Sequence, residues 1–250
     1  MLRVLVPMAG PPGAVGGKRF GGCKALAEIG QRPMIQHVYD NLSALGRCRF
    51  VFVIRRDDAA RFHLNEVLSL LDLGCAVVQA EGDTRGAACS ALLAVEHIAA
   101  DEPLVIANGD QILAADLGAV ANGFRERGLD GGIVVFDAIH PRWSYVRVDR
   151  QGLVVEAAEK RPISRIATAG TYWYRRGGDF LDGAMAMIRK DASVDGAFYV
   201  CPVFNEMILR GRRIGTHHVE RDRYFSLASL HGVDAYGEHL ADRRRAAVAT

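Results

Sequence analysis

The sequence has little net charge and no long apolar run, and each absence excludes a broad class of protein. Its 31 basic residues nearly balance its 29 acidic ones, which leaves a formal charge of +2. That balance offers no electrostatic attraction to the phosphate backbone of a nucleic acid. No apolar segment approaches the length that crosses a bilayer, and the N-terminus enters a predicted strand without a signal-peptide pattern. We therefore expect no nucleic-acid partner and no membrane partner.

Cysteine is also scarce, and the chain lacks repeats, low-complexity stretches and linkers. The five cysteines are odd in number, widely spaced and outside any metal-binding or redox motif. Such usage is typical of a reducing compartment, so we expect a cytoplasmic protein. With enough apolar content for a sizeable core and no linker, residues 1–250 are predicted to form one domain.

What the sequence does contain, in its first half, is an alternation of strands and helices. The hydrophobic patterns predict strands at residues 2–8, 50–54, 75–79 and 104–107, and helices at 33–45, 59–71 and 85–98. Strands that alternate with helices form a parallel sheet through right-handed crossovers.

After Gly132 the pattern changes to closely spaced strands. Strands are predicted at residues 133–136, 144–148 and 154–158, with a hairpin turn at 149–152, and later helices at 180–188 and 202–209. The basic run at 243–245 is interpreted as a solvated helix end. The whole pattern predicts an α/β fold, with a Rossmann-like, mostly parallel mixed sheet flanked by helices.

Two of the predicted strands end abruptly in small or polar residues. The first is followed by a glycine-crowded loop that reaches Lys24, and the strand at 104–107 is followed by Asn108-Gly109-Asp110. Free backbone N–H groups and a lysine are suited to phosphates, whereas a carboxylate is suited to a divalent metal. Together they predict a nucleotide site at the carboxyl edge of the sheet. Asp110 as a simple helix cap and Lys24 as an exposed loop residue are the alternatives.

Five motifs in order carry a family resemblance from Leu2 to about Arg213. They are Val6-Pro7-Met8-Ala9-Gly10, Arg32-Pro33-Met34-Ile35, Gly82-Asp83-Thr84-Arg85-Gly86-Ala87-Ala88, Ile106-Ala107-Asn108-Gly109-Asp110-Gln111 and Glu159-Lys160-Arg161-Pro162-Ile163-Ser164. The chain resembles the sugar-phosphate-type nucleotidyltransferases, whose fold is shared with nucleotide-sugar-dependent glycosyltransferases of the GT-A-like kind. It is most similar to a capsule-biosynthesis branch, some members of which transfer a cytidylyl group. Segments 140–145 and 198–206 also have counterparts in that branch.

The resemblance implies a reaction and a division of the chain. A phosphate or phosphonate oxygen of a small acceptor would attack the α-phosphorus of a nucleoside triphosphate, with CTP preferred, and pyrophosphate would leave. Residues 1–130 would bind the nucleotide, residues 131–235 the acceptor, and residues 236–250 would be a tail. A surface-polymer or natural-product pathway is implied, and a homodimer is left open.

By the same resemblance, site residues fall into three groups. Asp110 would hold Mg²⁺, Lys24 would neutralise the triphosphate, and Lys160 would bind the acceptor phosphoryl group unless it merely pairs with a nearby glutamate. The backbone of the first loop and the strand ends would line the nucleotide pocket, at Ala9, Gly10, Gly13 and Asn108. Thr84, Gly86 and Ala87 would approach the base and ribose.

The chain also departs from the family pattern in two places. An ungapped alignment puts Ala14 where the family's loop has an arginine, whereas a shifted register lets Arg19 supply it. No acid stands at the usual place of a second metal ligand, in the region Tyr224–Leu230, and Asp222 lies close by and could substitute. These gaps leave two alternatives to an active nucleotidyltransferase. One is a catalytically impaired, nucleotide-binding regulatory homologue. The other is a glycosyltransferase, which would more naturally carry an Asp-x-Asp motif.

Overall fold

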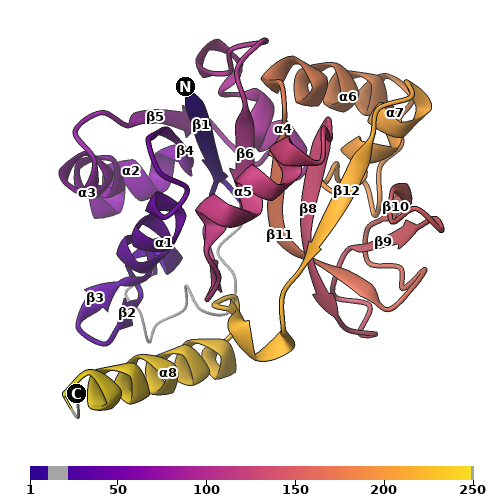
Figure 1. The fold of residues 1–250 in the computed structure, drawn as a ribbon. Helices are drawn as coiled ribbons and strands as arrows, with labels where there is room; N and C mark the ends of the chain where they lie inside the picture. Colours follow the sequence, from indigo (N-terminus) through magenta and orange to yellow (C-terminus); the bar gives the residue numbers. More distant parts are fainter. Residues whose placement is uncertain (11–21, 249–250) are drawn as a thin grey trace.

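A nine-stranded mixed sheet forms the centre of the computed structural model, which describes residues 1–10 and 22–248 (Figure 1). Its strands are β1 (Leu2–Pro7), β4 (Cys48–Arg55), β5 (Ala76–Ala80), β6 (Leu104–Ala107), β8 (Gly131–Asp137), β9 (Tyr145–Val148), β10 (Val154–Ala158), β11 (Ile166–Tyr174) and β12 (Ile214–His218). Their main order is β10-β9-β11-β6-β1-β4-β5, with β8 paired to β11 and β12 to β8. Strands β6, β1, β4 and β5 are parallel neighbours, which confirms the prediction for the first half.

Strand β11 joins this parallel part to the later strands. Its residues 171–174 pair antiparallel with β6, whereas Ala167 pairs with β9, and β8 lies along its other edge. Because β6 ends at Ala107, the β9–β10 hairpin continues the sheet beyond the carboxyl end of β6. The predicted closely spaced strands therefore exist, and they extend the same sheet. Asp149 Oδ1 accepts hydrogen bonds from the N–H groups of Gln151 and Leu153 in the predicted turn.

Helices cover both faces of the sheet and bury a hydrophobic core on each. One face packs α1 (Met34–Ser43), α2 (Arg56–Phe62), α3 (Leu64–Leu71) and α5 (Leu117–Glu126); the other packs α4 (Ala87–Leu92), α6 (Gly177–Arg189) and α7 (Val203–Leu209). Strand β1 shows how the sequence divides between them. Val4 and Val6 enter the first core and Leu5 the second, as the two-residue period of a strand requires.

Two predicted helices are shorter than their hydrophobic patterns indicated. The segment predicted as one helix at 59–71 is divided into α2 and α3 by His63, whose φ of 54° is left-handed. The segment at 85–98 is helical only from Ala87 to Leu92 and then forms a 3-10 turn at Val95–His97. Periodicity alone missed both interruptions because a single backbone conformation can end a helix without changing the spacing of apolar residues.

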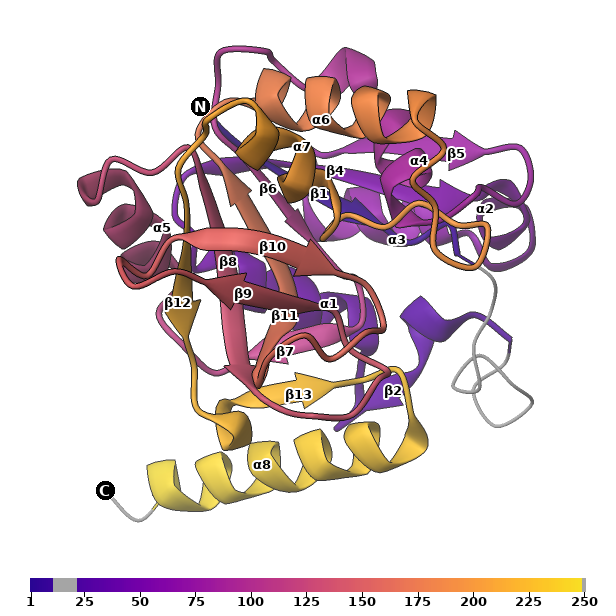
Figure 2. The same cartoon turned by 90° about the vertical axis from the view of Figure 1, so that its right-hand side faces the viewer.

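Two small two-stranded sheets and a long helix lie at the carboxyl edge of the parallel strands. Strand β7 (Gln111–Leu113) pairs with β13 (Tyr224–Ser226), and β2 (Glu28–Ile29) pairs with β3 (Arg32–Pro33). Helix α8 (Leu230–Val248) packs against β13 and β2, as Figure 2 shows. Within residues 1–10 and 22–248, no helix has both the length and the apolar character needed to span a membrane.

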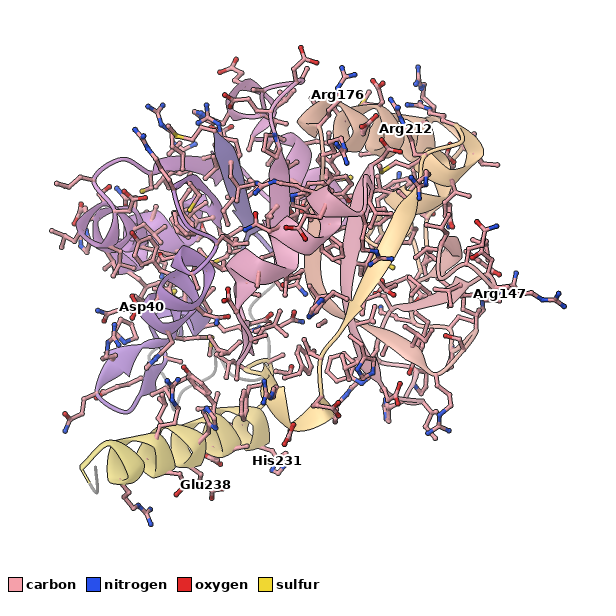
Figure 3. The ribbon with its side chains drawn as sticks, in the orientation of Figure 1. Asp40, Arg147, Arg176, Arg212, His231 and Glu238 are labelled. Atoms are coloured by element: carbon pink, nitrogen blue, oxygen red, sulfur yellow. The ribbon has the colours of Figure 1, made fainter. Side chains whose placement is uncertain are left out.

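On the opposite side of the molecule, two ion pairs connect α6 and the residue before it to neighbouring segments. Arg176, just before α6, pairs with Asp101 at 2.7 Å, and Arg212, after α7, pairs with the buried Asp179 at 2.8 Å. Figure 3 shows Arg176 and Arg212 beside α6 and α7, far from α8.

Candidate active site

A cavity of about 320 Å³ opens at the carboxyl edge of the parallel strands. Its lining comes from the segments that follow β1, β4, β5, β6 and β10, from the segment between α6 and α7, and from residues 22–25. These residues are Pro7, Met8, Gly10, Gly22, Lys24, Ala25, Asp58, Leu64, Ala87, Asn108, Gly109, Asp110, Glu159 and Tyr199. The two strand ends that the sequence singled out, after β1 and after β6, therefore meet at one cavity.

The backbone around Asp110 is held from several sides. The N–H of Asn108 donates to the carbonyl of Gly170 at 3.0 Å, and the carbonyl of Asp110 accepts from the N–H of Leu227 at 2.7 Å. Between them, Gly109 lies so close to β1 that a Cβ there would be 2.5 Å from Met8 Cγ. The Asp110 carboxylate is therefore carried by a fixed turn, and strand β7, not a helix, follows it. The helix-cap alternative is wrong, since Asp116 caps the next helix, α5.

The carboxylate of Asp110 forms an ion pair with Lys24 Nζ in the cavity wall. Lys24 begins a 3-10 turn, Lys24–Leu26, and the side chains of Lys24 and Asp110 are 26% and 24% exposed. Attraction between such charges is stronger than on an open surface because less water screens them. Lys24 is thus not a solvated loop residue, and its charge faces the same space as that of Asp110.

The other predicted nucleotide contacts divide into three groups. Gly10 and Asn108 line the cavity, whereas Ala9 is buried in the hydrophobic core. Gly13 and Arg19 lie outside the described residues, as do both registers considered for the loop arginine. Their predicted roles stay predictions.

Of the three residues predicted to approach the base and ribose, Ala87 lines the cavity. Gly86 has a φ of +99°, and a Cβ there would be 2.3 Å from the carbonyl oxygen of Phe198. The hydroxyl of Thr84 shares a hydrogen bond with that of Ser90 in α4. Close packing on the Phe198 backbone therefore requires glycine at position 86, and the predicted approach of this residue to the base and ribose stays a prediction.

Lys160 lies beside this cavity and lines a neighbouring one of about 520 Å³ between β10 and the end of α6. Its Nζ donates to the hydroxyl of Tyr199 at 2.8 Å and lies 3.7 Å from Asp195 Oδ2. The hydrogen bond to Tyr199 raises the pKa of Lys160, so the ammonium form is favoured. Glu156, one alternative partner, pairs instead with Arg147 and Arg161.

The structure does not bring Asp222 to Asp110, contrary to the expectation of a two-acid metal site. Pairing of β13 with β7 sets Ser226 opposite Gln111, and the Leu227 N–H bonds to Asp110, whereas Asp222 precedes β13 in an exposed turn. Within residues 1–10 and 22–248, no group of three or more acidic, histidine or cysteine side chains is arranged to hold a metal. Asp110 alone still fits Mg²⁺, which commonly takes one or two protein carboxylates together with substrate phosphates and water.

Sequence reasoning missed two acids and an aromatic residue in the cavity wall. Glu159 is the first residue after β10 and lines both cavities, and its carboxylate accepts a hydrogen bond from the Ser144 hydroxyl. Burial raises the pKa of Glu159, and the Ser144 hydrogen bond opposes that rise. Tyr199 lines the cavity, and its hydroxyl accepts a hydrogen bond from Lys160. Asp58 comes shortly after β4, just as Asp110 comes shortly after β6. An acidic residue soon after a predicted buried strand could therefore have identified Asp58 from the sequence.

Comparisons with known proteins agree with this geometry. Residues 13–170 match the family model of the MobA-like NTP transferase domain. A solved nucleoside-diphosphate-sugar pyrophosphorylase from Vibrio cholerae RC9 has a TM-score of 0.78 at 20% identity, covering 95% of this chain and 99% of its own. A UDP-glucose pyrophosphorylase solved with UDP-glucose has a TM-score of 0.75 at 14% identity, covering 97% and 99%. These likenesses confirm the predicted fold. No curated protein matches the chain.

Proposed function

The chain belongs to the MobA-like NTP transferase family, a nucleotidyltransferase family, and we propose that it transfers a nucleoside monophosphate from CTP to a small phosphorylated or phosphonate acceptor. The observation that carries the proposal is the Lys24–Asp110 ion pair in a cavity at the carboxyl edge of β1 and β6. Ligands of open α/β sheets bind at this edge. The preference for CTP and for this acceptor class rests on the resemblance to the capsule-biosynthesis branch.

In the proposed reaction an oxygen of the acceptor forms a bond to the α-phosphorus. The bond from that phosphorus to the bridging oxygen of pyrophosphate breaks, and pyrophosphate leaves with the electron pair. Negative charge gathers on the leaving group, so catalysis consists mainly of positioning and charge neutralisation. Lys24 would neutralise the departing pyrophosphate. Lys160 would bind the acceptor phosphoryl group, with Tyr199 holding its ammonium in place.

Asp110 is the residue that would hold Mg²⁺. When bound, Mg²⁺ would supply positive charge to the phosphate oxygens. Lys24 pairs with Oδ2 of Asp110, which leaves Oδ1 for the metal, and the pair would open when Lys24 turns to the triphosphate. Opening is compatible with the location of the pair in the wall of the cavity, where the triphosphate offers Lys24 an alternative partner.

A second candidate, a nucleotide-binding homologue without turnover, is favoured by one observation. The neighbours of Gln111 and Asp110 are Ser226, at the end of β13, and Leu227, directly after it, and neither is an acid. A metal with a single protein carboxylate is held more weakly than one with two. Binding of a nucleotide without transfer would then be the retained property.

Pyrophosphate release tests the two candidates together. The purified chain with Mg²⁺ is supplied with ATP, CTP, GTP or UTP, each combined with a panel of sugar 1-phosphates, other phosphate monoesters and phosphonates. We expect release above the Asp110→Ala background, with CTP as the best donor. Calorimetry with the same triphosphates accompanies the assay. Binding without release for every pair would support the second candidate, and absence of binding would contradict both.

A further inference from the structure

Asp58 stands at one end of the cavity, on the side away from the acceptor residues. Along the main path of the sheet, Glu159 follows β10, Asp110 follows β6, Gly10 follows β1 and Asp58 follows β4. If Lys24 and Asp110 serve the triphosphate at β6 and β1, and Lys160 serves the acceptor near β10, the β4 end remains for the nucleoside.

The surroundings of Asp58 are suited to a nucleoside and unsuited to phosphate. Leu64 at the start of α3 and Ala87 at the start of α4 line the same cavity. Lys24 is the one cation among its described lining residues, and it is paired with Asp110. A further carboxylate, in addition to those of Asp110 and Glu159, would repel a triphosphate, so Asp58 is suited to a ligand group that is neutral and donates hydrogen bonds.

The Asp58 carboxylate also lacks a partner that would explain its position. Within residues 1–10 and 22–248 it makes no hydrogen bond or ion pair; the charges of Arg55 and Arg61 act on it from a greater distance, and Arg55 reaches Asp57 at 3.5 Å. Burial raises the pKa of Asp58, and Arg55 only partly opposes this. The Asp58 oxygens are not fully buried, so water in the cavity can satisfy them, and a ligand that donates a hydrogen bond would take the place of that water.

We propose that Asp58 selects the nucleoside of the bound triphosphate by accepting a hydrogen bond from it. This inference rests on the proposed function. The donor chemistry has two sources in a nucleotide, the exocyclic amine of the base and the ribose hydroxyls. A carboxylate can only accept, so it favours an amine over the carbonyl oxygen that replaces it in UTP or ITP. It equally favours a ribose hydroxyl over the hydrogen of a deoxyribose.

Asp57, in the same helix turn, is a matched control that tests whether the role of Asp58 is purely structural. Asp57 and Asp58 both lie in the first turn of α2, where a negative charge stabilises the helix. The Asp57 side chain is 70% exposed, and it is not among the cavity-lining residues. Asp57→Asn and Asp58→Asn therefore remove the same helix-terminal charge, but only the second changes the cavity.

The test is calorimetric binding of nucleotides with Mg²⁺ and without acceptor. Wild type, Asp57→Asn, Asp58→Asn and Asp58→Ser are each titrated with CTP, UTP, ATP and ITP, and with the 2′-deoxy and 3′-deoxy forms of the tightest binder. Thermal unfolding confirms that each variant is folded. We expect wild type and Asp57→Asn to prefer the donor-bearing nucleotide, and both Asp58 variants to reduce that preference by about tenfold to a hundredfold.

The comparison of bases and the comparison of ribose with deoxyribose together identify the donor group. A reduced preference for CTP over UTP, or for ATP over ITP, assigns Asp58 to the base amine, and a reduced preference for the hydroxyl-bearing form assigns it to the ribose. Unchanged ratios in both arms, or no preference in wild type, would overturn the inference while the proposed function stands. If wild type binds none of the triphosphates, the proposed function fails and the inference fails with it.

Discussion

Two lysines, each beside an aspartate, mark two regions of this molecule that differ in burial. The side chains of Lys24 and Asp110 are each about a quarter exposed, at 26% and 24%, and they face each other directly. Lys160 is 43% exposed, and its partner Asp195, at 3.7 Å, is 77% exposed. Water screens the second pair much more than the first, so it contributes little to stability.

The difference indicates how each region would receive a ligand. At the β6 end, a ligand of Lys24 competes with the Asp110 carboxylate, which favours a strong anion for Lys24 together with a cation for Asp110. At the β10 end, the Lys160 ammonium contacts the hydroxyl and the ring of Tyr199 and forms a weak pair with Asp195. The first region is therefore suited to chemistry with a metal and a triphosphate, and the second to binding of an acceptor phosphate. The following predictions test this contrast.

The largest effect is expected at Asp110. Asp110→Ala should reduce turnover by about a hundredfold or more, because one metal contact commonly supplies several kcal/mol to the transition state. The steady-state rate of pyrophosphate release with the best substrates measures it. Asp57→Ala is the control for loss of a negative charge elsewhere. A folded Asp110→Ala protein with turnover near that of wild type would contradict the role.

The second-largest effect is expected at Lys24. Lys24→Ala is expected to lower kcat by about tenfold to a hundredfold, because its charge is needed most as pyrophosphate departs. Lys24→Arg should retain part of the activity. If the ion pair is only structural, Lys24→Ala will instead lower the unfolding temperature and leave kcat unchanged.

Lys160 should affect a different parameter. Lys160→Ala is expected to raise KM for the acceptor by about tenfold and to leave triphosphate affinity within about threefold, because the lost contact concerns the acceptor alone. Steady-state kinetics with each substrate varied, together with calorimetry of the triphosphate, separate the two. Tyr199→Phe, which removes only the hydrogen bond to Lys160, should give a weaker change of the same kind. Loss of triphosphate binding with acceptor affinity intact would refute the division.

The smallest effect concerns the pH dependence of stability and depends on Glu159. Its folded-state pKa is raised by burial, so between the ordinary glutamate pKa of 4.5 and the raised value the folded protein binds more protons than the unfolded chain. Stability from this group is therefore lost as pH rises through that window. Unfolding temperatures measured from pH 4 to pH 8 should fall less steeply for Glu159→Gln than for wild type. Parallel profiles would show that Glu159 titrates normally.

Much of the fold was predictable because its signals are local. A short apolar run that ends in a polar turn identifies a buried strand from its own residues, and alternation with helices fixes the parallel pairing of neighbours. Strands β1, β4, β5 and β6 were found in this way, with ends correct to within about two residues. The break at His63 was missed because its cause is the backbone conformation of one residue, which leaves the hydrophobic pattern intact.

The features of the site likewise divide into those that local sequence predicts and those that depend on tertiary structure. The sequence by itself determined that Asp110 follows a buried strand and that Lys24 follows a glycine-rich segment, because each statement concerns a few neighbouring residues. Only the tertiary structure decided which distant residues share their cavity. Register along β11 and β13 placed Glu159 opposite the β6 end, set Ser226 rather than Asp222 beside Gln111, and left Asp58 at the far end beyond β1. Strand order and register arise from contacts between segments far apart in the chain, and no local pattern encodes them.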